Sequence, residues 1–366
     1  MINVFGSCVG EEELKEIRTS LDAQWLGMGP KVDRFEKLFS EKLGQKFILL
    51  DNCSNGLYLA VQLLGLPEGS EVVLPANTWV SCATAVVLNG LVPVFADCDY
   101  ETLNVTRETV ADVLTAKTKA IMVVHYAGYP CDVESLKCFG LPVIEDTAHA
   151  ADSFLNGKHC GTLGDIGVFS FDSMKNIACG ELGGFTAKDP ELMDRAVKSR
   201  YCGLSKSGLQ ASTEKPRWWE YELNGYCIKQ LPNDIAASIG LAQLKKLPEL
   251  QKKRKAIYER YGQEFGGPDE SLDIQHSYFT YFLRDARRDE LARYLLDCGI
   301  YTTVRYQPLH LLFKEFYRKP LTVSEDFGEH GLNLPLHPNL SDDDVDYIIE
   351  KVHEFNFMGR DMGICV

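Results

Sequence analysis

Residues 141–150 read LPVIEDTAHA, and residues 164–176 read GDIGVFSFDSMKN. Each stretch contains a short apolar run that ends in polar side chains. The first run ends at Asp146, and the second leads through Ser170 to Lys175. Short runs rich in Val and Ile are typical of strands that are buried on both faces. We therefore expect two strands of one sheet, each followed by residues that carry chemistry.

The same pattern continues on both sides of these runs. Helical segments with apolar residues at helical spacing alternate with expected strands at residues 47–50, 71–74, 92–96, 120–125 and 142–144. This alternation predicts an α/β fold with a mostly parallel central sheet that is covered by helices on both faces. In such sheets, ligands bind at the carboxyl ends of the strands.

A second organisation begins at Asn233, which is placed as the N-cap of a long helix running to about Tyr261. The residues beyond it predict a strand at 278–283 and helices at 290–296 and 342–355. We therefore expect two domains. Residues 1–234 form a large cofactor-binding domain with an N-terminal helical segment, and residues 235–366 form a smaller α+β domain.

Composition excludes several classes of protein. A net charge of −14 argues against sequence-independent binding of nucleic acid, and the one dense basic run, residues 252–255, fits a solvated helix face. The sequence contains no apolar run of membrane-spanning length, and residues 1–16 show no basic segment followed by an apolar one, so we expect neither a membrane span nor a secretory leader. The twelve cysteines are scattered without a C-x-x-C pair, so we expect thiols in a cytoplasmic protein and no metal site.

Three features carry chemistry together. Taken singly, a structural role is favoured for each of them: helix capping for Ser54 and Asp146, and a surface position for Lys175. Combined, they form a set that suits pyridoxal phosphate. Lys175 offers an amine for the aldehyde, Asp146 a carboxylate for the ring nitrogen, and Ser170 with the helix that begins near Ser54 a place for the phosphate.

The runs LPVIEDTAHA, LGDIGVFSFDSMKN and GELGG resemble the motifs of the DegT/DnrJ/EryC1/StrS sugar aminotransferases, a branch of the fold-type I pyridoxal-phosphate enzymes. Flanking segments agree in order along nearly the whole chain, from VVLPANTWVSCATAVVLNGLVPVFADCD through DIAASIGLAQLKKL to LNLPLHPNLSDDDV. The resemblance implies a three-layer large domain of the aminotransferase type.

The resemblance also implies roles for individual residues. Lys175 matches the lysine that carries the cofactor as a Schiff base and moves protons, and Asp146 matches the partner of the pyridinium nitrogen. Trp79 stands where an aromatic side chain stacks on the cofactor ring. The positions that match phosphate contacts are Ser54, Asn55 and Ser170.

Three departures from the family pattern are visible. The usual S-G-T-A-A-L turn is replaced by CSNGL at residues 53–57. His149 stands where a glutamine usually contacts the ring hydroxyl. The segment 225–233 replaces a loop that, in the family, reaches the phosphate of the partner subunit through an asparagine. Cys227 puts that contact in doubt, and Lys229 is the alternative as a point charge.

The resemblance implies a ping-pong transamination in a homodimer whose active site lies at the interface. Glutamate is the expected amino donor, and a nucleotide-linked keto-sugar is the expected acceptor. Tyr306 and His310, in the segment YQPLH, are candidates for the substrate side.

Three alternatives remain open at this stage. A pyridoxamine-dependent sugar dehydratase of the same family has a histidine in place of the lysine, so Lys175 argues against it. A non-catalytic regulatory protein that binds the cofactor is the second alternative. The third, a nucleotide-binding dehydrogenase, lacks support because no G-x-G-x-x-G follows the first expected strand.

Overall fold

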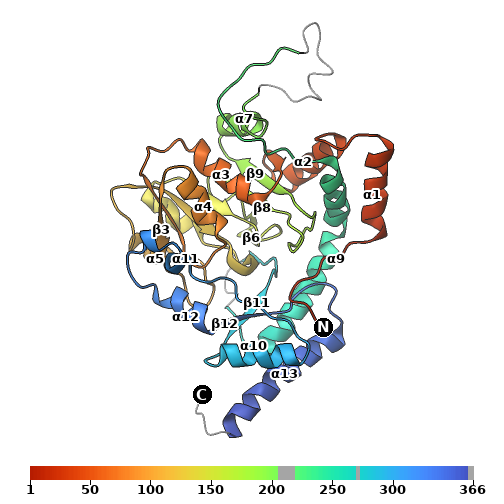
Figure 1. The fold of residues 1–366 in the computed structure, drawn as a ribbon, viewed down its shortest axis with the longest axis vertical. Helices are drawn as coiled ribbons and strands as arrows, with labels where there is room; N and C mark the ends of the chain where they lie inside the picture. The colour runs from red at the N-terminus through yellow and green to blue at the C-terminus, as the bar shows by residue number, and fades with distance from the viewer. Residues whose placement is uncertain (205–218, 269–272, 362–366) are drawn as a thin grey trace.

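The computed structural model describes residues 1–204, 219–268 and 273–361 (Figure 1). A seven-stranded sheet with strand order β1-β9-β8-β5-β4-β2-β3 lies at the centre. Its strands are β1 (Phe47–Leu50), β2 (Glu71–Pro75), β3 (Val92–Ala96), β4 (Thr118–Val124), β5 (Val143–Asp146), β8 (Ile166–Ser170) and β9 (Gly183–Ala187).

The sheet is mostly parallel, which confirms the predicted fold class. Strands β3, β2, β4, β5 and β8 pair in parallel, whereas β9 is antiparallel to both of its neighbours, β8 and β1. Residues 178–184 read as a small-residue turn in the sequence. In the structure Gly183 and Gly184 already belong to β9. The sequence does not indicate this start of the strand, because two glycines carry no apolar signal.

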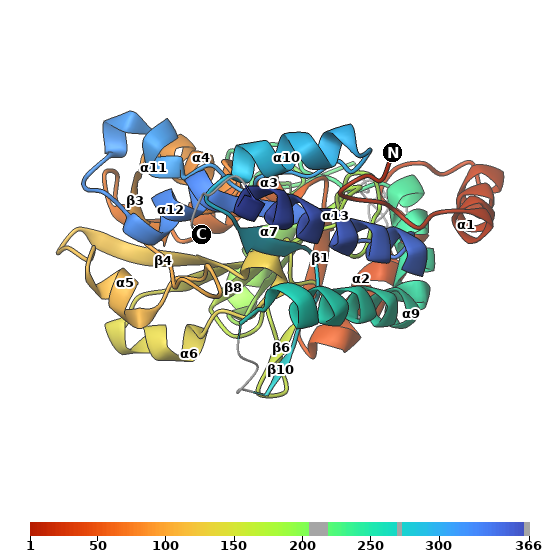
Figure 2. The same ribbon diagram turned by 90° about the horizontal axis from the view of Figure 1, so that it is seen from below.

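Helices cover the central sheet and form most of the rest of the described chain. Their bounds are α1 (Glu11–Asp22), α2 (Pro30–Leu43), α3 (Cys53–Leu63), α4 (Ser81–Leu88), α5 (Arg107–Ala111), α6 (Val133–Leu136), α7 (Pro190–Ser199), α9 (Asp234–Phe265), α10 (Arg288–Asp297), α11 (Leu309–Leu312), α12 (Thr322–His330) and α13 (Asp342–Asp361). Figure 2 shows α3 and α4 on one side of the sheet and α5 and α6 on the other. Alternate residues of β2 divide accordingly: Val72 packs in the core under α3 and α4, and Val73 packs in the core under α5 and α6.

A smaller lobe is built around the C-terminal half of α9. Strands β11 (Tyr281–Arg284) and β12 (Gly331–Leu334) form an antiparallel pair. They share a core with Ile257 and Tyr261 of α9 and with residues of α10 and α13. The first turns of α9 instead contribute Ala237 and Leu241 to a core with α2. Helix α9 therefore belongs to both lobes, and the predicted boundary at residue 234 stays a prediction.

Three very short strands were not expected from the sequence. They are β6 (Phe154–Leu155), β7 (Lys158–His159) and β10 (Ile274–Gln275), which form a separate small sheet. Two-residue strands are too short to show an apolar period, so the sequence offers no signal for them. Within the described ranges, the helices are all too short or too polar to cross a membrane.

Candidate active site

A cavity of about 380 Å³ opens where several parallel strands end. Val124, Asp146 and Ser170, the last residues of the adjacent strands β4, β5 and β8, all line it. The start of α3, the loop between β2 and α4, and residues 303–306 of the smaller lobe complete the wall. The cavity thus lies at the carboxyl edge of the sheet, where the sequence predicted a ligand site.

Lys175 lies in the turn that follows β8, where its backbone N–H donates to the carbonyl of Asp172. Its amine is 4.7 Å from the centre of the Phe279 ring. Burial, and then the nearby positive charge of Arg305, lower the pKa of Lys175 from 10.5 to about 8. An amine with such a pKa is neutral in about a tenth of the molecules at pH 7, a far larger share than for an ordinary lysine, which suits a nucleophile and a carrier of protons.

Asp146 is 3% exposed and faces the cavity from the end of β5. Its Oδ1 accepts a hydrogen bond from the backbone N–H of Ala148 at 2.9 Å, and its Oδ2 accepts one from the thiol of Cys82 at 3.1 Å. Burial and the charge of Asp146 raise the pKa of Cys82 well above its ordinary value, so this thiol remains a donor. Cys82 is a contact that sequence reasoning missed.

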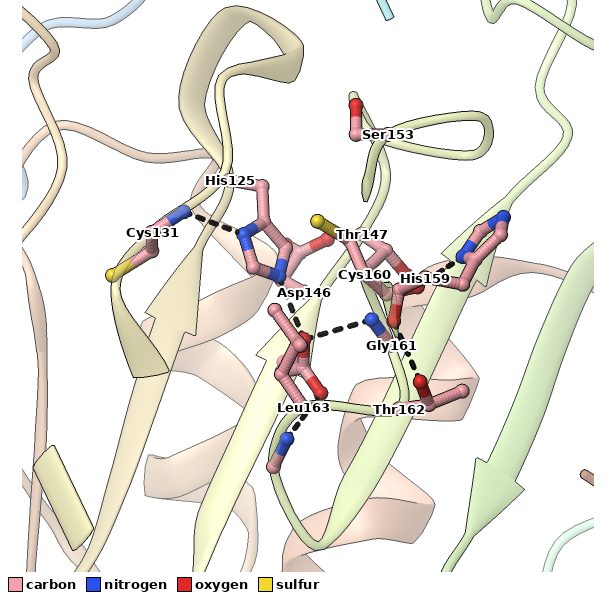
Figure 3. A network of polar contacts seen from close by, with 12 residues as sticks. His125, Cys131, Asp146, Thr147, Ser153, His159, Cys160, Gly161, Thr162 and Leu163 are labelled. Atoms are coloured by element: carbon pink, nitrogen blue, oxygen red, sulfur yellow. Dashed lines mark hydrogen bonds and ion pairs between the residues drawn. The ribbon is translucent and has the colours of Figure 1, made fainter. Parts of the chain in front are cut away.

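The neighbouring residue, Glu145, points to the opposite face of β5, as strand geometry requires. Its carboxylate accepts hydrogen bonds from the backbone N–H groups of Gly161 at 2.7 Å and Gly164 at 2.6 Å. It also bonds Nε2 of His125 at 2.9 Å, while Nδ1 of His125 accepts from the backbone N–H of Cys131 (Figure 3). This buried network joins β4, β5 and the loop before β8 directly behind the cavity.

His149 stacks on Phe279, with ring centres 4.0 Å apart, and its Nε2 lies 3.1 Å from the hydroxyl of Tyr306. Burial, with Lys175 and Arg305 nearby, holds the pKa of His149 well below its ordinary value, so the ring is neutral. Its Nδ1 is buried and has no hydrogen-bond partner among the residues that the structure describes. A polar group on a bound ring would satisfy this atom.

Two aromatic side chains stand at the mouth of the cavity. Trp79 is 56% exposed, and its ring centre is 5.8 Å from that of Tyr306. Burial raises the pKa of Tyr306 to about 12, so its hydroxyl stays protonated. Because both residues line the cavity, the rings of Trp79 and Tyr306 are placed to contact a cofactor or a sugar.

The N-terminus of α3 forms another wall. Asn52 is the N-cap, and its side chain accepts from the backbone N–H of Asn55 at 2.8 Å. Ser54 and Ser170 both line the cavity. The free amides of a first helical turn, together with two hydroxyls, make a suitable cradle for a phosphate.

Three of the predicted residues lie outside this wall, within the part of the chain that is described. The side chain of Asn55 donates to Asp51 at 2.8 Å. Lys229 is exposed. His310 is 1% exposed and lines a different cavity, of about 200 Å³, where its Nε2 lies 2.9 Å from Glu325. The roles predicted for these residues stay predictions.

Comparison with known proteins places the chain among aminotransferases. Residues 7–353 match the model of the DegT/DnrJ/EryC1/StrS aminotransferase family. A relative from Saccharopolyspora spinosa, dTDP-4-dehydro-2,3,6-trideoxy-D-glucose 4-aminotransferase, is 37% identical and covers 96% of both chains.

Solved structures agree in fold. The aminotransferase TlmJ from Streptoalloteichus hindustanus matches with a TM-score of 0.90 and 41% identity, over 96% of this chain and 98% of that one. Spr1654 from Streptococcus pneumoniae, solved in a PLP form, matches with a TM-score of 0.85 and 28% identity, over 95% and 96% of the two chains. With a family match over nearly its whole length, a carboxylate and an amine in one cavity, and this shared fold, the chain belongs to the DegT/DnrJ/EryC1/StrS aminotransferase family.

Proposed function

We propose that this chain is a pyridoxal-phosphate-dependent aminotransferase that converts a keto-sugar to an amino sugar, with Lys175 and Asp146 as its catalytic residues. The observation that carries the proposal is the meeting of these two side chains in one cavity: Asp146 ends β5, and Lys175 lies in the turn after the neighbouring strand β8. The dehydratase alternative is not favoured, because a lysine occupies the position where that enzyme has a histidine.

The residues of the cavity fit the cofactor. The first turn of α3, with Ser54 and Ser170, would hold the phosphate. Asp146 would hold the ring nitrogen, and the unpartnered Nδ1 of His149 would take the hydrogen bond of the ring hydroxyl. Trp79 would cover one face of the ring. When bound, pyridoxal phosphate supplies an aldehyde that takes up an amino group and a ring that withdraws electrons from the adjacent carbon.

The protein supplies the proton transfers. The lowered pKa of Lys175 lets its amine accept a proton from the carbon that carries the transferred nitrogen and return a proton in the reverse direction. Cys82 and the backbone N–H of Ala148 orient the carboxylate of Asp146. Phe279, packed against both the amine and the ring of His149, excludes water from this side of the site.

We further propose glutamate as the amino donor and a nucleotide-linked keto-sugar as the acceptor. The Saccharopolyspora relative is named for a dTDP-linked 4-keto sugar, and this name supports a nucleotide-linked keto-sugar as the acceptor. The exposed face of Trp79 beside Tyr306 supports it too, because sugars stack on aromatic rings.

A homodimer with a shared active site is also part of the proposal. Large apolar side chains are exposed in the segment that leads to Lys229: Tyr226 is 93% exposed and Ile228 is 48% exposed. Exposed apolar patches of this kind mark contact surfaces.

We place the protein in the cytoplasm, since the cysteines of the described residues are all free thiols.

Borohydride reduction of the loaded protein tests the central role. It is expected to fix the cofactor covalently on Lys175, as peptide mass mapping would show. The Lys175→Ala variant should lose both this attachment and turnover, whereas the exposed Lys46→Ala variant should keep both. Attachment at another lysine, or turnover by Lys175→Ala, would overturn the assignment.

The donor is tested by adding glutamate to the loaded wild-type protein without any sugar. The absorbance band of the aldehyde form should convert to that of the amine form, and 2-oxoglutarate should appear in equal amount. Sedimentation of the loaded protein tests the homodimer, which a monomer at micromolar concentration would contradict.

A further inference from the structure

The guanidinium of Arg305 is a buried cation in the wall of the cavity. The residue is 8% exposed and lines the same cavity as Lys175. Its side chain donates to the hydroxyl of Tyr306 at 3.2 Å and approaches the sulfur of Met174 at 3.8 Å. None of the ion pairs found among the described residues involves Arg305. Within the described part of the chain, no carboxylate oxygen therefore lies within 4.0 Å of this charge, although Asp146 lines the same cavity.

Two aromatic rings fix the plane of this guanidinium. Its central carbon lies 3.8 Å from the centre of the Phe5 ring and 5.3 Å from that of Phe279. The backbone N–H of Arg305 is held by Asn333 Oδ1 at 2.8 Å. A planar donor that is stacked and anchored in this way is prepared to receive two oxygens of one anion side by side.

The position carries an energetic cost that calls for a ligand. A buried, unpaired charge is unfavourable, and Arg305 also repels the other cation of the site, since it lowers the pKa of Lys175. Arg284, another largely buried and stacked arginine, shows the ordinary solution: it stacks on Tyr100 and pairs with Asp326 at 3.4 Å. An anion bound in the cavity would form the ion pair with Arg305 that Asp326 forms with Arg284.

We propose that Arg305 binds the α-carboxylate of the amino donor, and the same carboxylate of the keto acid that leaves. This inference rests on the proposed transamination and adds the residue that selects its first substrate. In an α-amino acid the carboxylate is one bond from the carbon whose proton Lys175 moves. The cation that binds it must therefore lie beside Lys175, and Arg305 shares the Phe279 ring with that amine.

The phosphates of a nucleotide-linked sugar are the competing anion. They are separated from the reacting carbon by much of a sugar ring, so a cation beside Lys175 suits them less well than one at the mouth of the cavity. A keto-sugar has no carboxylate of its own. Arg305 should thus act in the half-reaction with the amino acid and matter little in the half-reaction with the sugar.

The test compares wild type with Arg305→Met, Arg305→Lys and the control Arg284→Met. Arg305→Met is expected to lower kcat/KM for glutamate in the first half-reaction about 100-fold, as expected for loss of a two-pronged charged contact. The change for 1-aminopropane, an amine without a carboxylate, should be less than about threefold. Arg305→Lys keeps the positive charge but lacks the two parallel N–H donors, so its kcat/KM for glutamate should fall about tenfold. Arg284→Met should leave the preference for glutamate over 1-aminopropane unchanged.

The ratio of the two donors is the decisive readout. Removing Arg305 also raises the pKa of Lys175, but that change affects both amines alike and cancels in the ratio. Equal losses for glutamate and 1-aminopropane would overturn the proposal. So would a loss confined to the half-reaction with a dTDP-linked keto-sugar, which would assign Arg305 to the phosphates.

A binding measurement separates this inference from the proposed function. Succinate carries carboxylates but no amine, so calorimetric titration of the cofactor-loaded protein requires no turnover. Wild type should bind succinate at least tenfold more tightly than Arg305→Met. Equal binding would refute the role of Arg305, whereas tight binding by a wild-type protein that does not transaminate would refute the proposed reaction alone.

Discussion

Replacing Glu145 with glutamine tests the network behind the active site. The carboxylate receives three buried N–H donors, from Gly161, Gly164 and His125, at 2.6–2.9 Å. Because Nδ1 of His125 accepts from the Cys131 amide, Nε2 carries the ring proton and must donate to Glu145. All three partners therefore require an acceptor, and both carboxylate oxygens are in use.

An amide supplies only one acceptor oxygen. If that oxygen serves Gly161 and His125, the amide NH₂ faces the N–H of Gly164, donor against donor. The loss of one charged hydrogen bond costs about 1.5–3 kcal/mol, and an unpaired buried N–H costs about 1–3 kcal/mol. We expect Glu145→Gln to lower the free energy of unfolding by about 3–5 kcal/mol.

Urea unfolding of the cofactor-free protein, followed by far-ultraviolet circular dichroism, measures this difference. Glu134→Gln is the matched control: its side chain is 72% exposed, so the change in free energy should stay within about 0.5 kcal/mol. A loss of less than about 1 kcal/mol in Glu145→Gln would refute the reasoning. It would mean that the network rearranges around the amide at little cost.

Three further predictions concern the site itself. Burial first, and Arg305 second, lower the pKa of Lys175 to about 8, so the neutral amine prevails above about pH 8 instead of above 10.5. The rate at which the cofactor-free protein binds pyridoxal phosphate covalently should therefore rise through pH 8 and then level off, as absorbance would show. Cys82→Ala removes a donor to Asp146 worth about 1 kcal/mol, so the single-turnover rate with glutamate should fall about fivefold, and Cys82→Ser should restore most of it. A Cβ on Gly183 would lie 2.3 Å from backbone atoms at the start of α3, so Gly183→Ala should weaken cofactor binding by at least about tenfold in a fluorescence titration; Gly262→Ala, in an open part of α9, should leave binding unchanged.

Much of the fold could be predicted from the sequence because most strands of the central sheet contain a short apolar run. All four residues of β1 and all five of β2 are buried, so their runs stand out against amphipathic helices. The same argument fails for β6 and β7, whose two residues each are too few to show a period. It also fails at the start of β9, where Gly183 was read as part of a turn.

The candidate site divides in a similar way. Asp146 and Lys175 could be predicted because Asp146 ends β5, Lys175 lies in the turn after β8, and both stand in runs that resemble the family motifs. The sequence does not single out Arg305 or Cys82: the smaller lobe brings Arg305 to the cavity, and Cys82 is a helix residue with the pattern of a core position. His310 was chosen from its sequence neighbourhood beside Tyr306, yet the turn into α11 carries the two side chains into different cavities.

Helix α9 has a consequence for any attempt to dissect the protein. Its 32 residues span about 48 Å at 1.5 Å per residue, and its two halves are buried in different cores. A cut before Asp234 would remove Ala237 and Leu241 from their packing against Phe35 and expose that apolar surface. Fragments expressed on either side of such a cut should aggregate, and recombining them should restore a soluble product only if both are present as the chains refold.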